Sequence, residues 1–261
     1  MDSTATSNAI DDKALFDAVK EDDAEKFNKA IQAGANVNYQ SLDSYFDVNE
    51  VDFGRLNSSL HIASLRGFLP IVTRLLELNA NCNVINERGG GPLYSASYKG
   101  HLRVCELLIQ NGAAVNHARS IDGSTPLYVA AQEGHGAIVE QLLQHGANVD
   151  QARTDDGATP LIVASSVALV DVVVLLLSHA ASLHHVDNLG DTCFTYARDP
   201  QRNPNRKRGL LYRLRKWPTT MAILVLQELS LYYLIDCSSL IDLYQYIGTE
   251  LFTLDKEEDY E

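Results

Sequence analysis

The sequence predicts an all-α solenoid, built from stacked helix-turn-helix repeats joined by hairpin turns and followed by a helical C-terminal cap. Three series of residues predict this fold, because each recurs along the chain at intervals of 33, 34 and 34 residues. The series are Leu60, Leu93, Leu127 and Leu161; Gly67, Gly100, Gly134 and Ala168; and Asn83, Asn116, Asp150 and His184. A catalytic motif has no reason to recur at a fixed period, whereas a structural unit that stacks on copies of itself does.

The stretch "STPLYVAAQEGHGAIVEQLLQHGANVD" contains one complete unit. Thr125 is suited to cap the first helix, and Pro126 follows at the first helical position, where a missing N–H costs nothing. Gly134 is expected to end this helix, because glycine enters the left-handed backbone region without penalty. Apolar residues at helical spacing then predict a second helix, which Gly146 ends. One unit cannot bury its own apolar face, so neighbouring units must stack.

This pattern resembles the ankyrin repeat, whose signature reads T-P-L-H-x-A, over roughly residues 11–196. The resemblance implies a turn and two antiparallel helices per repeat, with about five repeats and a truncated sixth within residues 11–199. The residues at the signature His position are His61, Tyr94, Tyr128, Ile162 and Thr195. We expect tyrosine to replace the inter-repeat hydrogen bonding of that His in part, and isoleucine not to replace it. His101 and His135 recur with the repeat, so we expect them to be structural.

Departures from the repeat predict local differences in structure. The first repeat lacks Thr-Pro and has more polar faces, as expected of an end cap. The connection over residues 39–57 is longer than the other turns, which predicts an enlarged loop. Asn79 replaces a turn glycine and tolerates the left-handed region. Ala168 and Ala180 also replace turn glycines, and each would be strained in the left-handed conformation. We therefore expect altered turns and a softer fifth repeat.

Both ends of the chain are predicted to lie outside the repeats. Residues 1–10 are expected to be disordered, residues 200–249 to form a basic linker and a helical region, and residues 250–261 to form an acidic tail. The helical region, residues 205–248, is either a cap that covers the last repeat or a second docking site. The basic run Arg206–Arg208 is either a nuclear-import signal or a partner for the acidic stack.

Charge and apolar patterning exclude several classes of protein. The formal net charge of the 261-residue chain is −13, although residues 198–216 contain eight Lys or Arg and one Asp, a local +7. General nucleic-acid binding is therefore disfavoured, because the acidic bulk repels phosphates.

The apolar runs 169–177 and 221–235 are too short or too polar for a membrane span of about 20 residues. No secretory pattern opens the chain, which favours the cytoplasm or the nucleus. The four cysteines, Cys82, Cys105, Cys193 and Cys237, form no close pair and fit a reducing compartment.

No motif in the sequence predicts catalysis, and we expect no enzyme activity, no cofactor and no small-molecule substrate. The run Gly89–Pro92 lacks the Lys-Ser/Thr of a phosphate-binding loop. His184 and His185, with Asp187 nearby, are residue types that ligate metals. His184 occupies a recurring turn position, however, so we predict a structural turn there and no metal site.

The ankyrin resemblance implies protein binding through a concave surface, formed by the turn tips and the exposed positions of the inner helices. Carried over position by position, it assigns partner binding to seven helix residues: Ser97, Tyr98, Lys99, Gln132, Glu133, Ser165 and Ser166. At the tips it assigns Asn86, Glu87, Arg88, Arg119, Ser120, Ile121, Arg153, Thr154 and Asp155. We expect a polar interface centred near Tyr98. The predicted function is a non-enzymatic binding module or scaffold. The alternative is an adaptor of a ubiquitin ligase or similar machinery that docks through residues 205–248.

Overall fold

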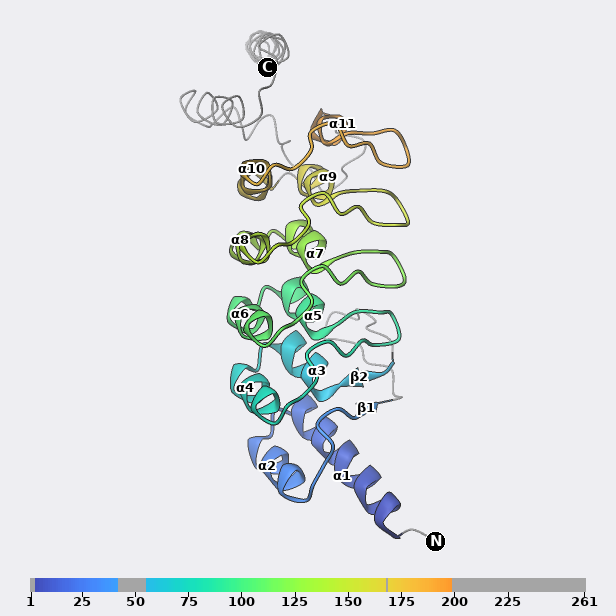
Figure 1. Cartoon of the computed structure of the whole chain (residues 1–261), viewed down its shortest axis with the longest axis vertical. Helices are drawn as coiled ribbons and strands as arrows, with labels where there is room; N and C mark the ends of the chain where they lie inside the picture. Colours follow the sequence, from blue (N-terminus) through green and yellow to red (C-terminus); the bar gives the residue numbers. More distant parts are fainter. Residues whose placement is uncertain (1–2, 42–54, 168, 199–261) are drawn as a thin grey trace, which may run out of the picture.

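Helix pairs stack in chain order in the computed structural model, which describes residues 3–41, 55–167 and 169–198 (Figure 1). The inner helices are α1 (Ser3–Lys20), α3 (Ser59–Arg66), α5 (Pro92–Lys99), α7 (Pro126–Glu133), α9 (Pro160–Ser166) and α11 (Cys193–Arg198). The outer helices are α2 (Ala24–Gln32), α4 (Leu69–Glu77), α6 (Leu102–Gln110), α8 (Gly136–Gln144) and α10 (Val170–Ser178). The only strands within the described residues are the short pair β1 (Gln40–Ser41) and β2 (Asn57–Ser58). The predicted all-α solenoid is confirmed.

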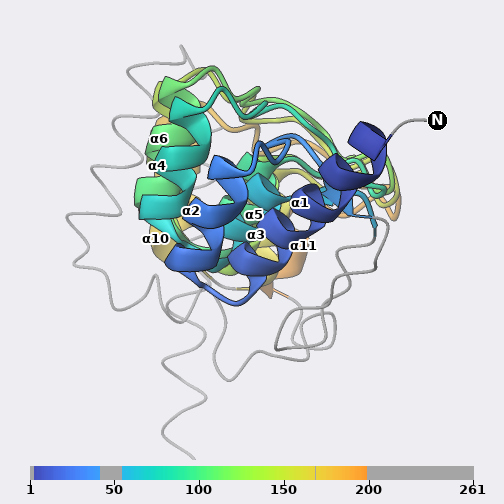
Figure 2. The same cartoon turned by 90° about the horizontal axis from the view of Figure 1, so that it is seen from below.

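The helices form two parallel layers. Each inner helix packs on the next, from α1 against α3 to α9 against α11, and the outer helices from α4 to α10 do the same. Seen along the stack, the outer layer lies on one side and the connections between repeats sweep away from the inner layer on the other (Figure 2). These connections, which we call fingers, project from the stack on the same side, one above the other, beside the inner helices (Figure 1).

The helix ends follow the expected local chemistry. The Thr125 side chain accepts a hydrogen bond from the Tyr128 N–H at 3.1 Å, and Thr159 accepts one from Ile162 at 3.3 Å. Each threonine is followed by a proline in the first helical turn. The left-handed conformation predicted for Gly134, with φ 80°, ends α7. Caps of this kind each contribute about 1 kcal/mol to stability. Two or three residues therefore determine where the helices of one repeat begin and end.

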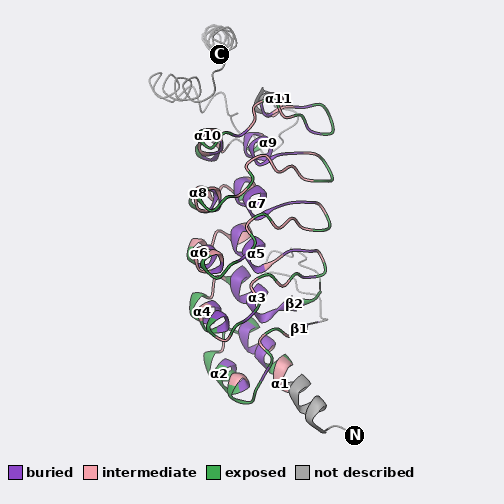
Figure 3. Cartoon of the chain, viewed as in Figure 1, coloured by how far each residue is buried: buried purple, intermediate pink, exposed green. Residues whose placement is uncertain are grey.

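A continuous apolar core runs through the inner layer (Figure 3). The four leucines of the first recurring series, Leu60, Leu93, Leu127 and Leu161, are all buried. Fully burying one leucine side chain contributes about 1.5–3 kcal/mol, so this position contributes to stability in each of the four repeats. In the outer helices only the stripe facing inward is buried, such as Ile138, Val139 and Leu142 in α8.

The first repeat and the following connection differ from the rest. The predicted disorder over residues 1–10 is wrong for residues 3–10, because α1 begins at Ser3 and no Gly or Pro interrupts the chain there. At the base of the enlarged loop, Gln40 pairs with Ser58 in the antiparallel β1–β2 ladder. The Gln40 side chain also donates to the Ile85 carbonyl at 2.8 Å, which ties the loop base to the next finger.

Two of the glycine replacements keep the left-handed backbone of a turn glycine, so the altered turn expected at Ala180 is wrong. Asn79 has φ 61° and Ala180 has φ 71°, so both lie in the left-handed region. Such a conformation costs an alanine about 1–2 kcal/mol, which is the strain expected for the fifth repeat. The other replacement, residue 168, lies outside the described residues. So do residues 42–54 of the enlarged loop and everything predicted for residues 199–261, including the run Arg206–Arg208. Within the part of the chain that is described, no helix is long and apolar enough to cross a membrane.

Candidate functional site

An exposed strip lies at the ends of the inner helices, where the sequence predicts partner contacts. Tyr98 and Lys99 end α5, Gln132 and Glu133 end α7, and Ser166 ends α9. All five are exposed or half-buried, whereas the preceding residues of each helix are buried. Lys99 Nζ lies 4.9 Å from the centre of the Tyr98 ring, and Gln132 donates to Glu133 at 2.9 Å. The strip therefore presents polar and aromatic side chains on a backbone that the core holds in place.

Three of the predicted contact residues are buried, so their assignment to the surface is wrong. Ser97 and Ser165 precede the exposed strip and face the interior, because an inner helix packs against both neighbours and its own outer helix. The Ser97 hydroxyl lies 3.7 Å from the Cys105 sulfur. Asn86 is buried because its side chain holds the finger together, where Oδ1 accepts from the Gly90 N–H at 2.9 Å.

Pairs of tyrosine and arginine side chains join successive fingers to the inner helices, and we call each pair a clasp. Arg119 donates to the Tyr94 hydroxyl at 2.9 Å, and its Cζ lies 4.9 Å from the ring centre. One repeat later, Arg153 donates to the Tyr128 hydroxyl at 3.4 Å. Burial raises the pKa of the Tyr128 hydroxyl to about 12, although the hydrogen bond from Arg153 acts in the opposite direction. The Tyr128 hydroxyl therefore stays protonated and accepts from the Arg153 guanidinium group.

The clasps change the role of two predicted contact residues. Arg119 also lies 3.6 Å from Asp122, and Arg153 pairs with Asp155 and with Asp156. The two arginine side chains are only 16% and 21% exposed. Both arginine charges are thus largely compensated by carboxylates of the same finger. Sequence reasoning missed this role, although the separation of 25 residues between Tyr and Arg recurs in both pairs.

The last described repeat has a different contact in place of the tyrosine–arginine clasp. Ile162 occupies the tyrosine position there, and Asp187 lies where the arginines stand in the earlier fingers. The Tyr196 hydroxyl, from the following helix, donates to Asp187 at 2.7 Å. The expectation that isoleucine cannot replace the signature His is consistent with this change of partners.

Histidines fix neighbouring helix ends to each other, as predicted for His101 and His135. His101 Nε2 lies 3.0 Å from the Leu65 carbonyl oxygen, and His135 Nε2 lies 3.2 Å from that of Tyr98. The rings pack so closely on the turn glycines that a Cβ at Gly100 would lie 2.6 Å from His135. The spacing between the ends of α3, α5 and α7 is therefore set by direct contacts.

The signature histidine, His61, bridges two repeats from a fully buried position. Its Nε2 lies 3.0 Å from the Gly90 carbonyl oxygen, while its Nδ1 accepts from the Ser58 N–H at 3.1 Å. A neutral ring with the proton on Nε2 satisfies both contacts. Burial lowers the pKa of His61 to about 4, against the smaller opposing effect of the Gly90 hydrogen bond.

The fingertips are the second exposed region. Ser120, Thr154 and Asp155 are exposed, and Ile121 is 56% exposed. Neighbouring fingers are joined by backbone hydrogen bonds, such as Thr154 N–H to the Asp122 carbonyl at 2.9 Å. Sequence reasoning did not single out the apolar residues of the last described finger, which are Val186 at 53% and Leu189 at 75% exposed. Because packing decides their exposure, no signal in the sequence marks them.

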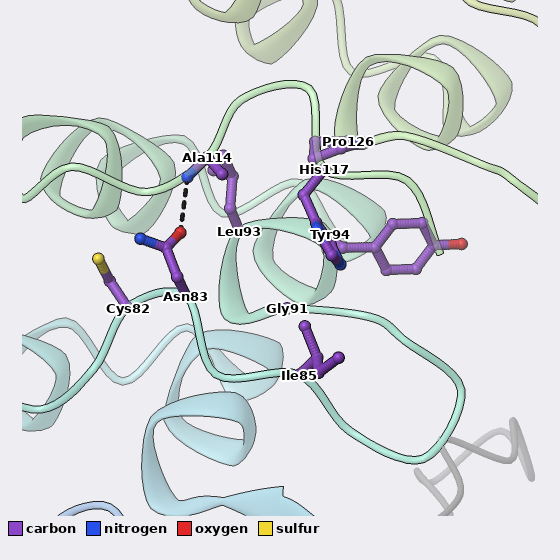
Figure 4. A pocket seen from close by; sticks show the side chains of 9 residues that line it. All are labelled: Cys82, Asn83, Ile85, Gly91, Leu93, Tyr94, Ala114, His117 and Pro126. Carbon is purple, nitrogen blue, oxygen red and sulfur yellow. Dashed lines mark hydrogen bonds between the residues drawn. The ribbon is translucent and has the colours of Figure 1, made fainter. Parts of the chain in front are cut away.

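A small cavity lies where the turn after α4 meets the next two inner helices (Figure 4). Its volume is about 40 Å³, which is room for a few water molecules. The lining residues are Cys82, Asn83, Ile85, Gly91, Leu93, Tyr94, Ala114, His117 and Pro126. Asn83 Oδ1 accepts from the Ala114 N–H at 2.8 Å, and the Cys82 thiol donates to the Asn111 carbonyl at 3.2 Å. Both groups serve the contact between repeats.

The side chains considered for chemistry have structural partners. His185 Nε2 lies 3.0 Å from the Gly157 carbonyl oxygen. Among the described residues, no group of three or more His, Cys, Asp or Glu side chains is arranged to hold a metal ion. Cys105 is buried in the core, and desolvation raises the pKa of its thiol to about 12. The thiol therefore lacks the thiolate character that a nucleophile needs.

Comparison with known proteins agrees with this architecture. The sequence matches the family model described as "Ankyrin repeats (3 copies)" over residues 15–119 and again over residues 112–187, more than half of the chain. The chain belongs to the ankyrin-repeat family. Stacks of these repeats act in protein–protein interaction, and the repeats themselves are non-catalytic.

A curated relative is similar to part of the chain. The chain is 42% identical over 73 residues to the "Probable E3 ubiquitin-protein ligase XBOS33" of Oryza sativa subsp. japonica. The match covers 28% of this chain and 14% of that protein. The similarity therefore concerns about a quarter of this chain and a small part of the relative.

Proposed function

We propose that this ankyrin-repeat protein is a non-enzymatic binding module or scaffold that holds a partner protein on its concave surface. The observation that carries the proposal is the exposed strip at the ends of α5 and α7, with Tyr98 and Lys99 beside Gln132 and Glu133. Tyrosine loses little conformational freedom on binding and is enriched among interface hot spots. The fingertips with Ile121 supply the apolar edge of the same surface.

The test is affinity capture from native lysate with the intact chain. A triple variant, Tyr98→Ala/Gln132→Ala/Glu133→Ala, truncates three of the five side chains of the strip. A matched control, Arg103→Ala/Glu140→Ala/Gln144→Ala, removes exposed side chains from the outer helices α6 and α8 of the same repeats. We expect partners to be lost with the first variant and kept with the second, at unchanged thermal unfolding. Partners that bind all three proteins equally would contradict the concave-surface assignment.

A second candidate function is a substrate-recruiting adaptor of a ubiquitin ligase or similar machinery. The similarity to part of a probable E3 ubiquitin-protein ligase favours it. In this case the machinery would dock through residues 205–248, which lie outside the described residues. Capture with a chain that ends at residue 204 tests it. Ubiquitin-ligase subunits lost from the truncated chain, with the stack still folded, would support the adaptor. A loss of solubility and of repeat stability would instead indicate a cap.

A further inference from the structure

Successive fingers are joined at their tips by one repeated contact. The backbone N–H of Thr154 donates to the Asp122 carbonyl of the finger before it at 2.9 Å. One repeat later, the N–H of Asn188 donates to the Asp156 carbonyl at the same distance. In each pair the acceptor directly precedes a turn glycine with positive φ. We call this carbonyl and its glycine a seat, and the residue of the next finger that packs there its occupant.

Each seat inside the stack accepts a small polar residue at very close range. A Cβ at Gly123 would lie 2.7 Å from the backbone nitrogen of Thr154, so any side chain at this glycine would exclude the occupant. The glycines of the three occupied seats have φ between 73° and 76°. The pairs of seat glycine and occupant are Gly89 with Ser120, Gly123 with Thr154, and Gly157 with Asn188. The same shape therefore recurs at three successive fingertips.

The last described finger has a seat of the same shape. Gly190 has φ 80°, and it follows Leu189 as Gly157 follows Asp156. Within the part of the chain that is described, and leaving its chain neighbours aside, nothing lies within 4 Å of a Cβ at Gly190. Among the same residues no donor reaches the Leu189 carbonyl. The Leu189 side chain is 75% exposed, so this seat offers a hydrogen-bond acceptor and an apolar contact together.

The finger that carries this seat is held in one shape by its own side chains. Asp187 Oδ1 accepts from the N–H groups of Leu189 and Asp191, both at 2.9 Å. Its Oδ2 accepts from the Tyr196 hydroxyl at 2.7 Å. The Asn188 side chain donates to a carbonyl of the preceding finger at 3.1 Å. A ligand that binds to such a preformed site loses little affinity to the ordering of the protein.

We propose that the partner protein places a turn of its own on the seat at Gly190 and so continues the row of fingers. The turn carries Ser, Thr or Asn, whose backbone N–H donates to the Leu189 carbonyl, and then Ile, Leu or Val, which covers the Leu189 side chain. The occupants inside the chain are of the first kind, and Ile121 directly follows one of them. An unpaired backbone edge is a template for such pairing. This inference rests on the proposed function.

A partner protein fits this seat better than a second copy or a further part of this chain. In a second copy, the N–H groups of Thr154 and Asn188 already donate within their own chain. A further finger of this chain would place its occupant 34 residues after Asn188, at residue 222, yet residues 210–247 contain no glycine for the turn. The row of fingers, in contrast, connects the seat to the exposed fingertips with Ile121 and Thr154, where the partner is proposed to bind.

The test is an NMR titration of the isotope-labelled full chain, observed through its backbone amides. The probe is the head-to-tail cyclic peptide GHARSIDGSG, which closes residues 117–124 through two glycines and carries Ser120 followed by Ile121. In the chain the Arg119 N–H donates to the Ser124 carbonyl at 2.9 Å, so closure is compatible with the shape of this finger. One control peptide carries Ser120→Pro, which removes the donor, and the other carries Ile121→Asp.

Two protein variants alter the seat, and each has a matched control. Gly190→Ala fills the seat with a Cβ. Its control is Gly112→Ala, because Gly112 has φ 84° and nothing within 4 Å of a Cβ, so the backbone strain is the same. Leu189→Ser removes the apolar contact. Its control is Ile85→Ser, because Ile85 is 45% exposed on a finger whose seat is occupied within the chain.

We expect the peptide to shift the amide signals of residues 187–191 in the wild-type chain. Gly190→Ala and Leu189→Ser should each weaken binding about tenfold, whereas Gly112→Ala and Ile85→Ser should bind as the wild type does. Both control peptides should also bind about tenfold more weakly than the probe. Equal binding to the wild type and to Gly190→Ala, or shifts confined to other residues, would overturn the proposal.

Two observations on the free chain would assign the seat to another occupant. Amide signals of residues 187–191 that shift with protein concentration would mean that a second copy occupies it. Nuclear Overhauser contacts between Gly190 and a residue beyond 198 would mean that the chain fills its own seat. Either observation would overturn the assignment to a partner.

Failure of this inference is distinguishable from failure of the proposed function. If the peptide does not bind, the seat does not select a turn of the partner and the inference is wrong. Capture of a partner that the Tyr98→Ala/Gln132→Ala/Glu133→Ala variant loses would then still support the concave surface. If that capture also fails, the proposed function itself is wrong.

Discussion

The guanidinium group of Arg153 lies over the ring of Tyr128, with Cζ 5.2 Å from the ring centre, and donates to the hydroxyl of the same side chain. The pair joins the finger of one repeat to the inner helix of the repeat before it. Tyr94 and Arg119 make the same contact one unit earlier. These tyrosines stand where the family signature has histidine, so the chain keeps an inter-repeat contact at this position with different chemistry.

A double-mutant cycle tests the strength of this clasp. Arg153→Met and Tyr128→Phe should each destabilise, and the double variant should lose less than the sum, with a coupling energy of about 0.5–2 kcal/mol. Free energies of unfolding from urea titration measure it. The control cycle pairs Tyr128→Phe with Arg103→Met, because Arg103 contacts Glu106 on an outer helix. Equal coupling in both cycles would mean that the stacked geometry contributes nothing specific.

Substitution of two glycines distinguishes the cost of backbone strain from the cost of steric crowding. Gly100 and Gly112 have φ of 80° and 84°, so alanine at either position is strained by about 1–2 kcal/mol. A Cβ at Gly100 would also collide with the His135 ring, whereas nothing lies within 4 Å of a Cβ at Gly112. We therefore expect Gly100→Ala to lower the urea midpoint more than Gly112→Ala does. Equal losses would show that the histidine contact yields without cost.

Acid should weaken the stack through His61. Its pKa is about 4 in the folded chain and about 6.5 when unfolded, because burial disfavours the charged ring. Above pH 6.5 both states are neutral and this part of the stability is fully present. As the pH falls from 6.5 towards 4, only the unfolded chain takes up the proton, so the free energy of unfolding should drop by up to about 3 kcal/mol.

The chain itself suggests the control for this pH effect. His61→Tyr places at this position the residue found in the next two repeats, and tyrosine does not titrate in this range. The variant should show a shallower loss of stability between pH 6.5 and pH 4 than the wild type, as measured by urea midpoints at several pH values. Identical slopes would place the acid sensitivity elsewhere, for example at His101.

The helix caps and turns of the repeat could be predicted from local chemistry. The burial of individual side chains depends on packing between helices and could not. Thr125, Pro126 and Gly134 each act through their own backbone, so their roles followed from residue type and spacing alone. The faces of the inner helices did not follow, because three neighbouring helices cover almost the whole of each one. Ser97 and Ser165 are polar but buried for this reason.

The candidate site was predictable in outline and not in detail. The partly or fully exposed pairs at the ends of α5 and α7 lie directly before turn glycines, a position that the repeat fixes in advance. The internal use of Arg119 and Arg153 depends on contacts between residues 25 positions apart, which composition and helical period do not contain. The exposure of Leu189 depends on what covers the last described finger, which is equally a matter of packing.

Hydrogen exchange with the captured partner tests the central claim most directly. The account predicts that the partner slows exchange of the backbone amides at the ends of α5 and α7, residues 96–100 and 130–134, and in the fingers over residues 118–123 and 152–157. The amides of the outer helices α6 and α8 should exchange at unchanged rates. Protection confined to the outer helices, or protection absent from both inner-helix ends, would contradict binding through the concave surface.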